Sequence, residues 1–382
     1  MTYFDNAATT YPKPEVVYSF MDRFYREFGA NVGRGQHKMA FSANKLREET
    51  RGLLLDLFCC PSKKVVFTNT ATEALNIILQ GVNLVDGSNI YVSPFEHNAV
   101  TRVLHHLEGI YKLNIHTLSV NEGALEYDLE KIKYQFSENQ PHLVVISHAS
   151  NVCGLLAPIK EICKLSKGYQ SINIIDMAQT AGLIDTDLSS GLYDFSVFSG
   201  HKTLYGPFGI AGFICNGEIV LQPLLFGGTG IESADQHMPV GTSNRYEVGS
   251  PNISAIAGLN AALKWIAEIG IDAIYRTERD NHSALLKVLG EFNSIKVIGI
   301  KDTSQTIGVV SCLFDGYSAD NIGQILSDQN IAVRTGLHCA PYAHKFLGTY
   351  PAGTVRFSVS YFNTQTDFEK LHDVLRYIED NG

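Results

Sequence analysis

The sequence has no apolar run that approaches the ~20 residues needed to cross a bilayer. It also has no basic block, because 39 acidic residues outnumber 30 Lys and Arg and the formal net charge is −9. Nonspecific nucleic-acid binding and docking to an anionic membrane are therefore poor hypotheses. The first residues, from Met1 to Asn6, lack the basic start and apolar stretch of a signal peptide, so we expect a cytoplasmic protein.

Seven cysteines are present, and their arrangement argues against two common uses. The number is odd, the chain is long and no secretory signal precedes it, so we do not expect a disulfide framework. No two cysteine pairs have the spacing of zinc ligands, and no metal site is predicted. Most of the cysteines are expected to be small core residues, which leaves the question whether one of them takes part in chemistry.

Length and apolar patterning predict an α/β protein with two domains. The 382 residues are more than twice the ~150 of a typical domain. From residue 63 onward, short apolar runs alternate with longer amphipathic stretches, as in a mainly parallel sheet whose strands are buried on both faces. These runs are residues 65–67, 90–92, 143–146, 172–175, 195–198 and 209–214.

Helical periodicity precedes this region, and a different rhythm follows it. Apolar residues recur every four positions from Val16 to Phe28, and a second helix is expected over residues 42–58. Beyond about Ser250 the pattern indicates a smaller α/β unit. Its expected elements are a helix over 256–269, strands at 296–300, 308–314, 331–333 and 354–359, a helix at 319–328 and a last helix over 368–378.

The most informative residues follow the apolar strand at 195–198. Ser199, His201 and Lys202 share one polar turn there, whereas an isolated lysine at a strand exit would usually be no more than exposed. Asp176 ends the strand at 172–175, and Lys202 follows it by 26 residues, which is room for one crossover between parallel strands. Ligands of open α/β sheets lie outside the carboxyl ends of strands, so the acid and the lysine are predicted to face one site.

An acid and a lysine in this arrangement suit pyridoxal 5′-phosphate (PLP). The lysine can form the Schiff base, and the carboxylate can keep the pyridine nitrogen protonated. Thr72 lies in a Thr-rich turn that runs from strand into helix and could cradle the phosphate. His97 could stack on the ring, while Asn151 and Gln179 could bind the phenolic oxygen and the substrate carboxylate. Each signal alone is weak, but together they occupy successive strand ends.

These segments make the chain resemble the class V aminotransferase family of fold-type-I PLP enzymes, and within it the cysteine desulfurases. The resemblance covers nearly the whole chain and is most specific at residues 199–202 and 334–339; the stretch from Phe4 to Thr10 also matches. It implies a large PLP-binding domain at residues 14–252 with a mainly parallel seven-stranded sheet. A small domain would combine residues 1–13 and 253–382, and two subunits would form a homodimer.

The resemblance also implies a role for each residue of the site. Those that would contact the ring are Lys202 as the Schiff-base lysine, Asp176 as the pyridinium partner, His97 as the stacking group and Gln179 at the phenolic oxygen. Those that would hold the phosphate are Ala71, Thr72, Ser199 and His201, with Ser250 reaching the phosphate of the neighbouring subunit's cofactor. Near the substrate, Arg356 would bind the carboxylate with the assistance of Asn151. Arg34 and Arg334 would line the mouth of the active site.

Cys339 is the predicted nucleophile. Arg334 and His338 are its expected cationic neighbours and would favour the thiolate. By the resemblance, Cys339 would act with Lys202 and His97 as the catalytic set. It would attack the sulfur of L-cysteine and keep it as a persulfide while alanine leaves, and a sulfur-acceptor protein would then approach. Selenocysteine is the other substrate that the resemblance implies.

The sequence departs from the family pattern at two places. Gly33 occupies a position where many relatives carry histidine, and the stretch at residues 340–350 differs from that of the better-studied sulfur-mobilising members. The chain nevertheless keeps the short spacing that is typical of the selenocysteine-lyase-like subgroup, because Arg356 follows Cys339 by 17 positions. The alternative function is a carbon–sulfur β-lyase or aminotransferase of the same family in which Cys339 is not the nucleophile. A binding protein that has kept the fold without its chemistry is a third.

Overall fold

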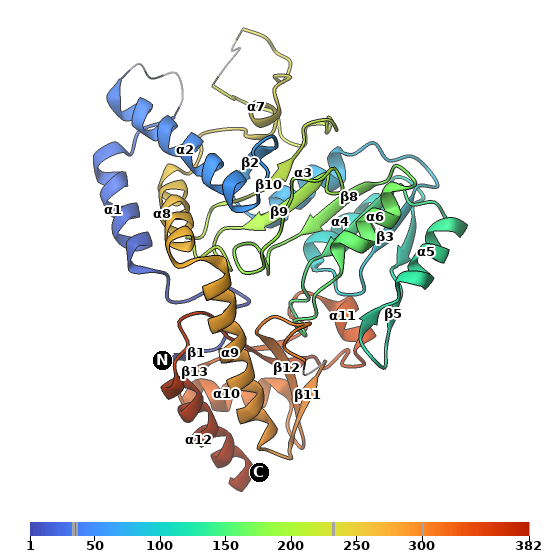
Figure 1. Ribbon diagram of the computed structural model, residues 1–382, viewed down its shortest axis with the longest axis vertical. Coiled ribbons are helices and arrows are strands. Elements are labelled where there is room, and N and C mark those ends of the chain that lie inside the picture. Colours follow the sequence, from blue (N-terminus) through green and yellow to red (C-terminus); the bar gives the residue numbers. More distant parts are fainter. Residues whose placement is uncertain (33–34, 36, 231–233, 300–301, 382) are drawn as a thin grey trace.

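A seven-stranded sheet forms the centre of the protein (Figure 1). In this computed structural model, which describes residues 1–32, 35, 37–230, 234–299 and 302–381, the strand order is β2-β10-β9-β8-β7-β3-β4. β10 runs antiparallel to both of its neighbours, and the other four strand pairs are parallel, which confirms the predicted mainly parallel sheet. The strands are β2 (Lys64–Thr68), β3 (Asn89–Val92), β4 (Asn114–Thr117), β7 (Leu143–Ser147), β8 (Ile172–Asp176), β9 (Phe195–Ser199) and β10 (Ala211–Cys215).

Helices cover both faces of this sheet because its strands are apolar on both sides. In β7, Val144 and Ile146 join one core, whereas Leu143 and Val145 join the opposite one. The first core is covered by α1 (Glu15–Phe28), α2 (Lys38–Leu57), α5 (Leu129–Glu138), α6 (Ile159–Lys167) and α8 (Ile253–Ile269). The second is covered by α3 (Ala71–Gly81) and α4 (Asn98–Glu108).

The C-terminal part is built on a second, antiparallel sheet of order β11-β12-β15-β14. Phe357 and Leu371 lie in its own apolar core, separate from those of the large sheet. The strands are β11 (Ile295–Ile298), β12 (Val309–Phe314), β14 (Arg334–Gly336) and β15 (Thr354–Ser358). The helices that accompany them are α9 (Ile271–Gly290), α10 (Ala319–Asp328), α11 (Pro341–Phe346) and α12 (Gln365–Asn381).

The N-terminal strand returns to this C-terminal part. β1 (Thr2–Tyr3) pairs in parallel with β13 (Ile331–Ala332), and the N-terminus lies beside β13 in Figure 1. Phe4 is fully buried in the core of the second sheet. The chain then continues through residues 5–13 toward the large sheet, so this segment joins the two sheets. The division into domains at residue 252 remains a prediction.

The remaining elements are short. A hairpin joins β5 (Val120–Asn121) to β6 (Glu126–Tyr127), and α7 (Thr242–Tyr246) lies in the loop that follows β10. Within the ranges described above, no helix combines the length and the apolar character needed to cross a membrane.

Candidate active site

A cavity of about 280 Å³ opens at the carboxyl ends of β7, β8 and β9, where Ser147, Asp176 and Ser199 end their strands. Parallel strands bring these ends to one edge of the sheet, as predicted. Most of the predicted site residues line this cavity: Ala71, Thr72, His97, Asn151, Asp176, Gln179, Ser199, His201, Lys202, Arg334 and Arg356.

A tight turn after β9 places Lys202 in the cavity. A Cβ at Gly200 would lie 2.6 Å from the carbonyl oxygen of Ile210, so the turn requires glycine there. Burial in the protein lowers the pKa of Lys202 to about 8, although Asp176 opposes the shift. A larger fraction of this amine is therefore neutral near neutral pH than in an exposed lysine.

The N-terminal segment clamps this turn from outside the large sheet. The carbonyl oxygen of His201 accepts hydrogen bonds from Oγ1 of Thr9 at 2.9 Å and from Nζ of Lys13 at 2.6 Å. The carbonyl of Lys202 accepts from Oγ1 of Thr10 at 2.9 Å. Lys13 is not among the site residues that the sequence predicts, although the neighbouring stretch from Phe4 to Thr10 matches the family pattern.

Asp176 is a buried acid at the end of β8. Burial raises the pKa of its carboxyl, while the N–H of Ala178, which donates to Oδ1 at 2.9 Å, and the charge of Lys202 lower it. An acid in such a place gains from pairing with a cation that enters the cavity. Its position thus suits the predicted partnership with a protonated ring nitrogen.

His97 is neutral and has a defined tautomer. It is the N-cap of α4, and its Nδ1 accepts a hydrogen bond from the N–H of Ala99 at 3.0 Å. The proton of the neutral ring therefore resides on Nε2. Burial, reinforced by the charges of Lys202 and Arg334, lowers the pKa of His97 to about 4. The side chain can stack and donate from Nε2, but it is not a cation at neutral pH.

The start of α3 provides the predicted phosphate cradle. Thr70 caps the helix by accepting from the N–H of Glu73 at 3.0 Å, and Ala71 and Thr72 line the cavity. The first N–H groups of a helix lack partners within the helix and favour anions. His201 stacks on Phe208 with ring centroids 4.5 Å apart, and burial lowers its pKa to about 3.

Arg356 is held from two sides in the cavity wall. Its side chain is 1% exposed; Nη1 donates to the carbonyl of Asn151 at 3.0 Å and Nη2 to Oδ1 of Asp5 at 2.8 Å. The amide nitrogen of Asn151 donates to the carbonyl of His338 at 2.7 Å, so this side chain anchors the loop that carries Cys339. Its role in substrate binding remains a prediction.

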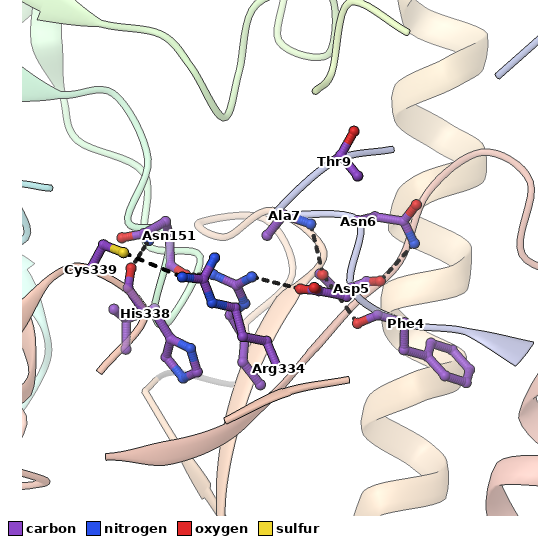
Figure 2. Close-up of polar contacts among 12 residues, drawn as sticks. Phe4, Asp5, Asn6, Ala7, Thr9, Asn151, Arg334, His338 and Cys339 are labelled. Carbon is purple, nitrogen blue, oxygen red and sulfur yellow. Dashed lines mark hydrogen bonds and ion pairs between the residues drawn. The ribbon is translucent and has the colours of Figure 1, made fainter. Parts of the chain in front are cut away.

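Cys339 lies in a short loop between β14 and α11, and its Sγ accepts from Nη2 of Arg334 at 3.3 Å (Figure 2). Both His338 and Cys339 have left-handed backbone conformations, with φ of 48° and 58°. The carbonyl of Cys339 accepts from the N–H of Asn98 at 2.7 Å, which ties the loop to the first residue after His97. The half-buried thiol is thus fixed beside the cavity next to a cation.

The prediction that His338 is a second cation beside the thiol is wrong. His338 is 2% exposed, and burial, together with the charge of Arg356, lowers its pKa to about 2. Its Nε2 lies 2.9 Å from Oγ1 of Thr354. Neighbours in sequence do not reveal burial, so the charge state of this ring could not be read from the sequence.

The other predicted residues lie elsewhere. Ser250 lines a different and larger cavity, of about 940 Å³, and its Oγ accepts from the side chain of Asn31 at 3.3 Å. Arg34, like Gly33, lies outside the described residues. Among the six cysteines expected in cores, Cys59 is exposed instead, and the others are buried.

Comparison with known proteins identifies the family. The model of the family described as Aminotransferase class-V matches residues 2–371. A probable cysteine desulfurase of Pyrococcus abyssi is 32% identical over 98% of this chain and 93% of its own length. One of Methanothermobacter thermautotrophicus is 28% identical over 100% of this chain and 95% of its own.

Solved structures agree with this assignment and confirm the predicted fold class. The apo structure of a cysteine desulfurase from Thermococcus onnurineus NA1 has a TM-score of 0.92 at 29% identity and covers 100% of this chain and 95% of that one. The S-sulfonic acid form of a cysteine desulfurase from Escherichia coli has a TM-score of 0.86 at 25% identity, with 98% and 94% covered. The chain belongs to the class V aminotransferase family, whose members use PLP.

Proposed function

We propose that the protein is a PLP-dependent cysteine desulfurase that converts L-cysteine to L-alanine and receives the sulfur on Cys339. The observation that carries this proposal is the thiol of Cys339, held 3.3 Å from Arg334 beside the cavity that Lys202 and Asp176 line. The relatives named cysteine desulfurase support it, since the chain covers nearly their whole length.

The residues around the cavity fit PLP. Two buried polar atoms, Oδ1 of Asn151 and Nδ1 of His201, find no hydrogen-bond partner within the described residues, as expected where a polar ligand completes a site. The residues that would hold the cofactor are Lys202 at its aldehyde carbon, Asp176 at its ring nitrogen, His97 on its ring face, Gln179 at its phenolic oxygen, and Ala71, Thr72, Ser199 and His201 at its phosphate. When bound, PLP supplies an electron sink for the amino-acid carbon skeleton.

The chain's own side chains would then orient the substrate and take the sulfur. Arg356 binds the α-carboxylate by charge-assisted hydrogen bonds, which places the substrate sulfur toward Cys339. The Cys339 thiolate forms a bond to that sulfur as the carbon–sulfur bond breaks, and the electron pair of the broken bond stays with carbon. That carbon takes up a proton, for which the amine of Lys202 is the cavity's buried proton carrier. Cysteine and the enzyme thiol thus become alanine and an enzyme persulfide.

Product identification tests this proposal against the alternative within the family. Purified protein loaded with PLP and given L-cysteine and a reductant should release alanine and sulfide in equal amounts. A β-lyase would instead release pyruvate and ammonia, and that product set would replace the proposal with the alternative. L-selenocysteine in a parallel reaction shows whether the predicted action on selenium exists.

The pH dependence of cofactor capture reports the state of Lys202. Only the neutral amine attacks an aldehyde, and the pKa of this amine is lowered from 10.5 to about 8 by burial. The rate at which the apoprotein takes up PLP should therefore rise with pH and level off above about 8. Stopped-flow absorbance at the cofactor band measures it, and a rise that continues to pH 10 would contradict the lowered pKa.

The proposal also includes the oligomeric state of the protein, its cellular compartment and its sulfur acceptor. The protein would be a homodimer, as its family resemblance implies, and Ser250, which lines a second cavity, would reach the phosphate of the neighbouring subunit's cofactor. Sedimentation should give twice the mass of the chain, and a monomer that binds PLP normally would contradict this. The thiol of Cys339 must be kept free between turnovers, which requires a reducing compartment and favours the cytoplasm, and a sulfur-acceptor protein would take the sulfur from Cys339.

A further inference from the structure

The carboxylate-binding arginine already has a carboxylate partner in the protein. Nη2 of Arg356 donates to Oδ1 of Asp5 at 2.8 Å, and the Asp5 side chain is only 21% exposed. The charge of Asp5 counteracts the lowering of the Arg356 pKa by burial, whereas the charge of Arg334 reinforces it. Asp5 is thus the resident counter-ion of a buried guanidinium.

The ion pair is not what holds the N-terminal segment in place. The N–H of Phe4 donates to the carbonyl of Ala332 at 2.8 Å, and the N–H of Ser358 donates to the carbonyl of Phe4 at 2.6 Å. The N–H of Ala7 donates to Oγ of Ser358 at 2.8 Å. The side-chain amide of Asn6 donates to the carbonyl oxygen of Ser358, also at 2.8 Å. These contacts fix the backbone on both sides of Asp5, which Phe4, Asn6 and Ala7 flank in Figure 2. The Asp5 carboxylate is therefore not needed to hold this segment in place, because its neighbours already do so.

We propose that Asp5 is a positioning residue that sets the affinity of Arg356 for the α-carboxylate of amino acids. The inference rests on the proposed function, in which both L-cysteine and L-alanine carry that carboxylate. Asp5 occupies one N–H of the guanidinium and places a negative charge beside the incoming anion. It thereby lowers the affinity of the site for both L-cysteine and L-alanine, so that the product can dissociate.

Elementary electrostatics indicate the size of the effect. Two carboxylates about 6 Å apart on one guanidinium repel each other enough, at an effective dielectric constant near 20, to change affinity by about 100-fold. The Asp5 side chain is partly exposed, and solvent screening reduces this upper bound to about tenfold. A bare buried guanidinium would instead gain strongly from any carboxylate that reached it, because an uncompensated buried charge is costly. Removing the charge of Asp5 while keeping its shape should therefore tighten amino-acid binding rather than loosen it.

The test compares L-alanine with ethylamine, which is alanine without its carboxylate, by calorimetric titration of the PLP-loaded protein. Asp5→Asn keeps an oxygen that can accept from Nη2 but removes the charge. We expect it to lower the Kd for L-alanine about tenfold and to leave the Kd for ethylamine unchanged. Asp5→Glu, which retains the charge, should stay within about twofold of the wild type for both ligands. Asp22→Asn removes an equal charge from the exposed pair with Arg26 and should change neither affinity.

An unchanged or raised Kd for L-alanine in Asp5→Asn would overturn the proposal, and so would an equal tightening of both ligands. If that variant does not fold, Asp5→Ser removes the same charge, and the same two outcomes apply to it. The wild-type product assay decides the proposed function separately. Release of pyruvate by the wild type would reject desulfuration, while the alanine-against-ethylamine comparison would still judge Asp5.

Discussion

Lys202→Ala should abolish turnover of L-cysteine, with alanine formation falling by about 10³-fold or more. Lys202 is the lysine that lines the cavity within the described ranges, and its lowered pKa makes it the amine prepared to hold the cofactor and to carry a proton. The variant should also lose the cofactor on gel filtration, because the covalent attachment is gone. Alanine release and cofactor absorbance measure the two effects.

Two control variants separate the amine's chemistry from its charge. Lys202→Arg keeps the positive charge beside Asp176 but offers no neutral amine near neutral pH, so it should be as inactive as the alanine variant. Lys133→Ala removes an exposed lysine of α5 and should match the wild type. Turnover by Lys202→Ala within about tenfold of the wild type would contradict the assignment.

Cys339→Ala should remove sulfur transfer while leaving the cofactor in place. The thiol contacts Arg334 and lies outside the residues predicted to hold PLP, so the variant should bind PLP and L-alanine as the wild type does. Alanine release from L-cysteine should fall about 10²-fold or more, because no other described thiol lies in this loop. Rates from alanine quantification, together with cofactor absorbance, check both statements.

The matched control is Cys59→Ala, which removes the exposed thiol at the end of α2. It should retain full activity, since Cys59 is exposed and is not among the residues that line the cavity. Undiminished alanine release by Cys339→Ala would show that the cysteine is incidental. The β-lyase or aminotransferase alternative would then be favoured.

The large sheet could be predicted because strands buried on both faces are continuous apolar runs. β4 was missed, because it lies at the sheet edge and Asn114 and Thr117 are exposed, which interrupts the apolar pattern. α9 was missed for a different reason: Glu278 and His282 occupy buried positions on its inner face. Glu278 is stabilised there by the hydroxyl of Tyr205, which donates to it at 2.7 Å, a partner that no periodicity reveals.

The candidate site was largely predictable because the carboxyl ends of parallel strands meet at one edge. Asp176 and Lys202 needed only this rule. Asp5 could not be assigned in the same way, because its contact with Arg356 depends on the pairing of β1 with β13, 328 or more residues away along the chain. Predicting that contact would require knowing how the N-terminal segment joins the second sheet.

The mass of the peptide that contains Cys339 tests the central claim most directly. PLP-loaded protein is given L-cysteine without reductant, alkylated, digested and analysed by mass spectrometry. Cys339 should carry one additional sulfur atom, with alanine formed in equal amount, while Cys59 should carry the alkyl group alone and no additional sulfur. Alanine formation with no sulfur on Cys339, or with the sulfur on another cysteine, would contradict the account.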